Sequence, residues 1–144
     1  MWNLFAENSG LRKQFLAPLG FPTIVCLCGS TRFFDTFHRI NLEETLAGKI
    51  VLSIGCDTKS DQDLIEAIAS GEITGSKWPM GAKEKLDWLH LRKIELANVV
   101  DILNVGGYIG ESTSRELQYA RELHKSIYWL EQSDLMRPDE RLYR

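Results

Sequence analysis

The sequence predicts a single-domain α/β fold of Rossmann-like (flavodoxin-like) type, with a doubly wound, mostly parallel sheet of four to five strands. The apolar run at residues 23–28 is continuous rather than alternating, as in a strand buried on both faces of a parallel sheet, and residues 99–105 are predicted to form another buried strand. Helix-length segments separate these runs, and glycines mark the turns between them. Strand, helix and strand at this spacing form βαβ units with right-handed crossovers.

The chain divides into three predicted parts. Residues 1–22 are expected to form an N-terminal helical lead-in that ends at Pro22, because a proline restricts the residue before it. Residues 23–131 are expected to form the α/β domain. The charged residues 132–144 form a C-terminal tail, which we expect to be solvated or to cover a partner.

Apolar runs predict the strands of the domain, and amphipathic segments predict its helices. The expected strands are residues 23–28, 49–54, 99–105 and 126–130. The expected helices are residues 33–46, 83–97 and 114–123. Gly48 ends the first helix, because glycine readily adopts the left-handed conformation that follows a helix end. The second helix places Leu86 and Ile94 on one face, so it should pack on the sheet. Residues 55–81 are irregular apart from a helical piece at 62–69, a pattern typical of an insertion or lid.

Length and composition fit one domain with one hydrophobic core. The chain has 144 residues, of which 44% are hydrophobic and 26% charged, and its net charge is −3. Its basic residues are scattered, which argues against a nucleic-acid polymer as partner. The sequence has no apolar run of about 20 residues, the length that crosses a bilayer, and its first residues do not resemble an export signal. We therefore expect a cytoplasmic protein that binds small molecules and has no membrane contact.

Cys26 and Cys28 lie two residues apart in a predicted strand, so they should point to the same face as buried thiols. Together with Cys56 the cysteines are odd in number, and they indicate no disulfide framework. No set of carboxylates, histidines or cysteines has the spacing of metal ligands. The sequence therefore predicts no metal and no cofactor.

Two loops that follow buried strands form the candidate ligand site, because parallel sheets bind ligands beyond the carboxyl ends of their strands. The candidate substrate-binding residues of these loops are Gly29, Ser30, Thr31, Arg32, Gly107, Tyr108, Gly110, Ser112 and Ser114. Glycines let backbone amides approach an anion, hydroxyls donate hydrogen bonds, and an arginine can hold a phosphate through two N–H groups. Tyr108 can stack on a base or simply pack against the loop. Equally, the serines can act as helix caps and Arg32 can be solvated.

The two common nucleotide-binding signatures are absent. The chain has no G-x-x-x-x-G-K-[ST], which disfavours a P-loop NTPase. The glycines at 106, 107 and 110 do not have the G-x-G-x-x-G spacing of a dinucleotide dehydrogenase.

Three segments carry a family resemblance: Cys28-Gly-Ser-Thr-Arg32, Ala97-Asn98-Val99-Val100 with the helix before it, and Glu116-Leu-Gln-Tyr-Ala120 with its preceding loop. Together they resemble the nucleoside 2-deoxyribosyltransferase-like superfamily, which includes nucleoside deoxyribosyltransferases and 5'-monophosphate N-glycosidases. The resemblance implies an enzyme that cleaves the N-glycosidic bond of a nucleoside or nucleoside 5'-monophosphate, as a hydrolase or transferase. It also implies a homodimer or larger homo-oligomer, and it places the catalytic glutamate at Glu116.

The chain departs from this family pattern at three positions. His90 stands where the family usually has an aspartate, Asn98 where another aspartate is common, and Asp101 in a strand position that is usually apolar. We expect His90 and Asp87, one turn apart on a helix, to assist departure of the base as catalytic residues. The alternative for His90 is a half-buried histidine with a hydrogen-bond partner.

A looser resemblance links Gly106-Gly107 and Thr113-x-x-Glu116 to the cytokinin-activating phosphoribohydrolases, which also cleave the N-glycosidic bond of a nucleotide. In both cases Glu116 would stabilise or trap an oxocarbenium-like sugar. Its place in the first turn of the predicted helix should favour the ionised form. Two alternatives stay open: Thr113-x-x-Glu116 is a capping box, or the chain is a non-catalytic nucleotide-binding module of the same fold.

Overall fold

The computed structural model describes residues 20–54, 66, 69–70 and 82–144. These residues form one five-stranded sheet in which every pair of neighbouring strands is parallel. The strands, in the order β2-β1-β3-β4-β5 across the sheet, are β2 (Ile50–Leu52), β1 (Ile24–Cys28), β3 (Val99–Ile102), β4 (Ser126–Trp129) and β5 (Arg141–Leu142). This is the flavodoxin-like strand order of a doubly wound sheet. The predicted fold class is confirmed.

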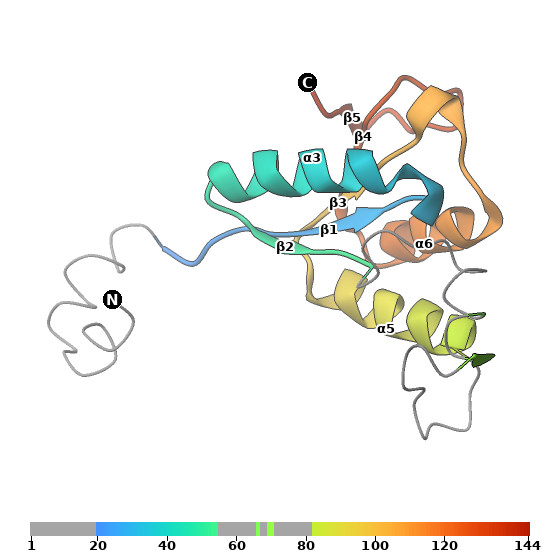
Figure 1. Ribbon diagram of the computed structural model, residues 1–144. Helices are drawn as coiled ribbons and strands as arrows, with labels where there is room; N and C mark the ends of the chain where they lie inside the picture. Colours follow the sequence, from blue (N-terminus) through green and yellow to red (C-terminus); the bar gives the residue numbers. More distant parts are fainter. Residues whose placement is uncertain (1–19, 55–65, 67–68, 71–81) are drawn as a thin grey trace, which may run out of the picture.

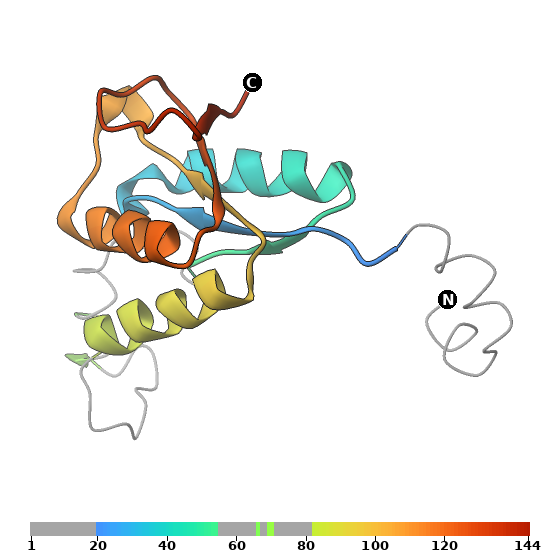
Figure 2. The same cartoon turned by 180° about the vertical axis from the view of Figure 1, so that it is seen from behind.

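Helices cover both faces of the sheet, as Figures 1 and 2 show from opposite sides. Helix α3 (Phe34–Leu46) lies on one face, and α5 (Ala82–Leu96) and α6 (Glu111–Glu122) lie side by side on the other. Short 3-10 turns, η2 (Thr31–Phe33) and η3 (Val105–Gly107), follow β1 and β3. No helix within the described residues is long and apolar enough to cross a membrane.

The hydrophobic core has two halves, one on each side of the sheet. Because successive side chains of a strand point to opposite faces, Cys26 and Cys28 enter the half beneath α5 and α6. Val25 and Leu27 enter the half beneath α3. All four side chains are fully buried, and burial of such apolar groups stabilises the fold by roughly 1.5–3 kcal/mol for each large one. The prediction that the two cysteines share a buried face is confirmed.

Part of the C-terminal segment at residues 132–144, predicted to be solvated or to cover a partner, joins the sheet instead of being solvated. Strand β5 pairs in parallel with β4, and Tyr143 is buried in the core half beneath α3. The buried Glu140 accepts hydrogen bonds from Arg121 Nε at 2.7 Å and from Trp129 Nε1 at 3.0 Å. A charged segment joins the fold here because the charge that it buries is paired. The predicted lead-in at residues 1–22 lies outside the described residues, except for its last three.

Two boundaries near the candidate site differ from the prediction. Strand β3 ends at Ile102 rather than at residue 105, and α6 begins at Glu111 rather than at residue 114. Gly106 and Gly107 adopt left-handed φ angles of 64° and 80° in the η3 turn, which lies between the end of β3 and the start of α6. The predicted lid and its helical piece at 62–69 lie outside the described residues, apart from isolated positions.

The loops after β1 and β3 leave the same edge of the sheet side by side. Leu103 N–H donates to the Cys28 carbonyl at 2.8 Å, which extends the pairing of the strands to the beginning of both loops. A Cβ atom at Gly29 would lie 3.1 Å from Leu103 Cβ and 3.2 Å from the Leu103 carbonyl oxygen. Only glycine therefore lets the two loops approach this closely.

Candidate active site at the carboxyl ends of the strands

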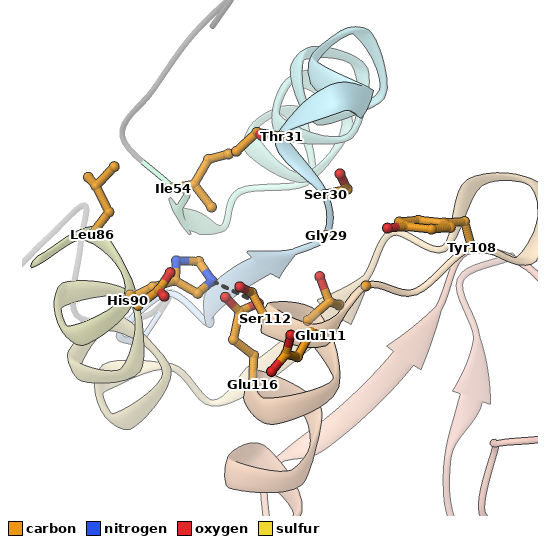
Figure 3. Close-up of a pocket in the computed structure, with 13 residues that line it drawn as sticks. Gly29, Ser30, Thr31, Ile54, Leu86, His90, Tyr108, Glu111, Ser112 and Glu116 are labelled. Carbon is orange, nitrogen blue, oxygen red and sulfur yellow. Dashed lines mark ion pairs between the residues drawn. The ribbon is translucent and has the colours of Figure 1, made fainter. Parts of the chain in front are cut away.

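A cavity of about 270 Å³ opens where the loops after β1 and β3 meet α5 and α6 (Figure 3). It lies at the switch point of the sheet, since β1 has β2 on one side and β3 on the other. The lining residues are Gly29, Ser30, Thr31, Ile54, Leu86, Asp87, His90, Tyr108, Gly110, Glu111, Ser112, Thr113 and Glu116. The position and the mixed lining are those of a small-ligand site.

Most of the residues selected from the sequence line this cavity, but three do not. The residues that do are Glu116, His90, Asp87, Gly29, Ser30, Thr31, Tyr108, Gly110 and Ser112. Ser114 Oγ instead donates to the Gly110 carbonyl at 2.8 Å, so this hydroxyl belongs to the first turn of α6. Gly107 shapes the η3 turn. Arg32 lies at the rim, beside Tyr108.

Arg32 and Tyr108 link the two loops above the cavity. The guanidinium carbon of Arg32 lies 4.3 Å from the centroid of the Tyr108 ring, a cation–π contact. One Arg32 Nη donates to the Tyr108 hydroxyl at 3.3 Å, and Arg32 Nε donates to Ser30 Oγ at 3.1 Å. Ser30 is also the N-cap of η2, so the capping alternative for this serine holds while the residue still lines the cavity.

Glu116 lies in the second turn of α6 and points toward the cavity and His90 (Figure 3). Since α6 begins at Glu111 after the N-cap Gly110, Thr113 is inside the helix and the capping box does not form. The Glu116 side chain is largely buried, and its Oε2 has no hydrogen-bond partner among the described residues. Burial raises the pKa of Glu116 to about 7, although nearby His90 acts in the opposite direction. The expectation of a readily ionised first-turn carboxylate is therefore wrong.

His90 connects the cavity with the two buried thiols of β1. Its Nε2 lies 3.3 Å from Cys28 Sγ, 3.7 Å from Cys26 Sγ and 3.8 Å from Glu116 Oε2. The side chain is only 3% exposed, so it is more deeply buried than the half-buried histidine of the alternative interpretation. Burial lowers the pKa of His90, but Cys26 and Glu116 together raise it above its ordinary value.

The pKa values of the two thiols are shifted in opposite directions. A hydrogen bond from Cys28 lowers the pKa of Cys26 to about 5, against the effect of burial. Burial and the neighbouring Cys26 raise the pKa of Cys28. These opposite shifts favour ionisation of Cys26 before Cys28, next to the imidazole of His90. The Sγ atoms and a ring nitrogen of His90 all lie within 4.8 Å of one another, close enough to hold a metal ion.

The sequence did not predict this cluster, because His90 is 62 residues from Cys28 along the chain. The available signal was two same-face cysteines in one strand and a histidine on a helix expected to pack on that sheet. The structure brings them together because α5 crosses the face of β1 that carries both thiols.

The amino-terminal turn of α6 also faces the cavity. Gly110, its N-cap, provides no side-chain hydrogen bond, and Glu111, Ser112 and Thr113 line the cavity from this first turn. The first backbone N–H groups of a helix lack intrahelical acceptors and, with the helix dipole, favour an anion. At the outer rim, an Arg115 Nη lies 3.5 Å from Asp87 Oδ2 and joins α6 to α5.

The other two departures from the family pattern lie away from the cavity. Asn98 is at the amino end of the strands, where its Oδ1 accepts from Ile24 N–H at 2.9 Å. Asp101 lies on the face covered by α3, buried next to Glu44. Burial and the Glu44 charge raise the pKa of Asp101 to about 7. These two positions support the fold rather than the site.

Fold and cavity together define a doubly wound α/β protein with a cavity at the switch point of its sheet. Neither a scan against protein-family models nor a search of curated proteins gives a match for this chain. The resemblance to the deoxyribosyltransferase-like superfamily therefore stays a prediction from the residues.

Proposed function

We propose that the protein cleaves the N-glycosidic bond of a nucleoside or nucleoside 5'-monophosphate, with Glu116 as the nucleophile. The main supporting observation is the Glu116 carboxyl group, which faces the switch-point cavity and has an oxygen without a hydrogen-bond partner among the described residues. This carboxyl is neither capping α6 nor paired with a lysine or arginine in the described structure. It is thus available to the anomeric carbon of a bound sugar.

In the proposed reaction, Glu116 attacks the anomeric carbon as the carbon–nitrogen bond breaks, and a glycosyl ester forms on the enzyme. The departing base takes the bonding electrons and needs a proton or hydrogen bonds, for which Asp87 and His90 are the candidates. Water or a second base then attacks the sugar and frees Glu116. With a pKa of about 7, Glu116 is substantially ionised at neutral pH, and the developing positive charge of the sugar favours the anion further.

The hydroxyl groups around the cavity support a 5'-phosphate as part of the substrate. Hydroxyl side chains line the cavity at Ser30, Thr31 and Ser112, next to the amide groups of the first turn of α6. Arg32 at the rim adds a positive charge that its contact with Tyr108 holds in place. The homo-oligomer implied by the family resemblance and the cytoplasmic location expected from the sequence belong to this proposal as well.

The proposal is tested by chromatographic measurement of free base released from a panel of ribo- and deoxyribonucleosides and their 5'-monophosphates. Glu116→Gln preserves shape and removes the nucleophile, so release should fall by about 10³-fold or more. Glu122→Gln, the same change at the exposed far end of α6, is the matched control and should keep full activity.

Absence of base release from every substrate by the parent chain would contradict the proposal. If nucleotides still raised the melting temperature in that case, the alternative of a non-catalytic nucleotide-binding module would be favoured. Equal activity of Glu116→Gln and the parent would exclude Glu116 as the nucleophile even if base were released.

A further inference from the structure

Four side chains of metal-ligand type converge behind the inner wall of the cavity. Cys26 and Cys28 come from β1, His90 from α5 and Glu116 from α6. The three residues Cys26, Cys28 and His90 are almost completely buried, and their ligand atoms lie within 4.8 Å of one another. The two cysteines belong to the core half beneath α5 and α6, and the neighbours of His90 and Glu116 on these helices, Ile94 and Leu117, pack into the same half.

The distances from the His90 nitrogen to the two sulfurs fit a tetrahedral zinc centre. Zinc binds sulfur at about 2.3 Å and nitrogen or oxygen at about 2.0–2.2 Å, so tetrahedral ligand atoms lie roughly 3.3–3.8 Å apart. His90 Nε2 lies 3.3 Å from Cys28 Sγ and 3.7 Å from Cys26 Sγ. The same nitrogen lies 3.8 Å from Glu116 Oε2. One ion placed among the two sulfurs and the imidazole nitrogen would be within bonding distance of these three atoms after small side-chain rotations. Glu116 is not among the ligand atoms that lie within 4.8 Å of one another, so its carboxylate would have to move toward the ion to complete the set.

A second observation points to a missing ligand. Glu116 Oε2 is buried without a hydrogen-bond partner among the described residues, although it is directed at the cluster. An unsatisfied buried carboxylate oxygen is costly, and a bound cation would remove that cost. Two sulfurs and an imidazole are soft or borderline ligands, which select zinc-class metals over magnesium or calcium.

We propose that Cys26, Cys28 and His90, with Glu116 as the fourth ligand, bind a zinc-class divalent metal ion. Both thiols bind as thiolates, and the protons they lose pass to the solvent. This site goes beyond the proposed function, because the cysteines do not line the cavity. One consequence rests on that function: Glu116 cannot be ligand and nucleophile at once, so bound zinc would inhibit base release.

The test uses the full chain, purified under reducing conditions and freed of metal with a chelator, and Co²⁺ as the probe. One equivalent of Co²⁺ should produce thiolate-to-cobalt charge-transfer absorption and the intense visible bands of a tetrahedral centre, and Zn²⁺ should displace it. Cys26→Ala and Cys28→Ala should each weaken Zn²⁺ binding by at least about 100-fold, because even outer-shell changes cost 10–100-fold. His124→Asn, at an exposed histidine beyond the far end of α6, is the control and should bind like the parent.

Glu116→Gln should keep the charge-transfer absorption but bind more weakly, which assigns the fourth ligand. Zinc-edge X-ray absorption of the parent should show two sulfur neighbours at about 2.3 Å, and this result does not depend on any variant folding. No charge-transfer absorption, or binding unchanged in both cysteine variants, would overturn the site. Metal binding by a chain whose metal-free form releases no base would refute only the proposed function, whereas base release by the metal-free chain without metal binding would refute only this site.

Discussion

His90 Nε2 lies 3.8 Å from Glu116 Oε2, and this contact joins α5 to α6 at the floor of the cavity. The two residues are 26 positions apart in the sequence, and packing of their helices on the same face of the sheet brings them together. A histidine at this distance stabilises the ionised carboxylate and fixes its direction. The family resemblance expects an aspartate at this position, so the chain has a basic group where the family has an acidic one.

If Glu116 is the nucleophile, His90 acts as its positioning residue. His90→Asn removes the nitrogen that faces Glu116, and kcat for base release should fall by about 100-fold with little change in KM, as misplacement of a reacting group predicts. His90→Gln can return an amide nitrogen near the same point and should recover part of the loss. Assays in a chelating buffer separate this effect from any metal effect.

His124→Asn is the matched control for this prediction. His124 is exposed and has a left-handed φ of 57°, a conformation that asparagine tolerates well. The His124→Asn variant should have the same kcat and KM as the parent. An effect of His90→Asn on KM alone would show that His90 contributes to substrate binding instead.

The sequence was sufficient to predict the sheet and the edge where the cavity lies. The strand β1 is a continuous apolar run followed directly by Gly29, and the glycine turn at Gly106 comes shortly after β3, so the edge of the site could be located without a structure. Predictions from such local patterns are correct where the tertiary fold favours the same local structure. The start of α6 was missed by one turn because Gly110 can serve as an N-cap without a side chain.

The chemical properties of the cavity could not be predicted from the sequence, because they depend on contacts between residues that are far apart along the chain. Glu116 was expected to be ionised from its distance to the helix start, but burial against α5 decides its pKa. The Cys26, Cys28 and His90 cluster requires the register of β1 under α5, which sequence spacing does not give. Strand β5 was not predicted, because it is only two residues long and pairs through backbone groups, so its sequence has no hydrophobic periodicity.

Glu140 should be essential for holding the C-terminal segment against the sheet. Its carboxylate receives two hydrogen bonds from Arg121, at 2.7 and 2.8 Å, and one from Trp129 Nε1 at 3.0 Å. Glu140→Gln removes the charge and leaves these buried donors poorly paired, so the free energy of unfolding should fall by about 2–4 kcal/mol in urea denaturation. Glu122→Gln, on the exposed surface of α6, should change it by less than about 0.5 kcal/mol. Equal stability of the two variants would show that the segment contributes little to the fold.

Asp101 gives the fold a pH dependence of its own. It is buried under α3 with Glu44, whose Oε2 lies 2.9 Å from Lys49 Nζ, and the adjoining cavity is also lined by Tyr128, Tyr143 and Arg144. Burial and Glu44 raise the pKa of Asp101 from its ordinary value of 3.8 to about 7. Between these two pH values the folded state holds a proton that the unfolded chain has lost. Stability from this group therefore falls as the pH rises through this window.

Asp101→Asn should remove this loss, because asparagine fills the same space and can donate to Glu44 without titrating. Above pH 7 the variant should be more stable than the parent by a few kcal/mol, since each unit of pKa shift corresponds to about 1.4 kcal/mol. Near pH 4 the two should be about equally stable, because Asp101 is then protonated in the folded parent. Urea denaturation of both proteins at several pH values measures the difference, and the parent-minus-variant comparison cancels the titration of Glu116 and His90. A difference that did not change with pH would mean that Asp101 is ionised in the folded protein, with Lys49 compensating its charge.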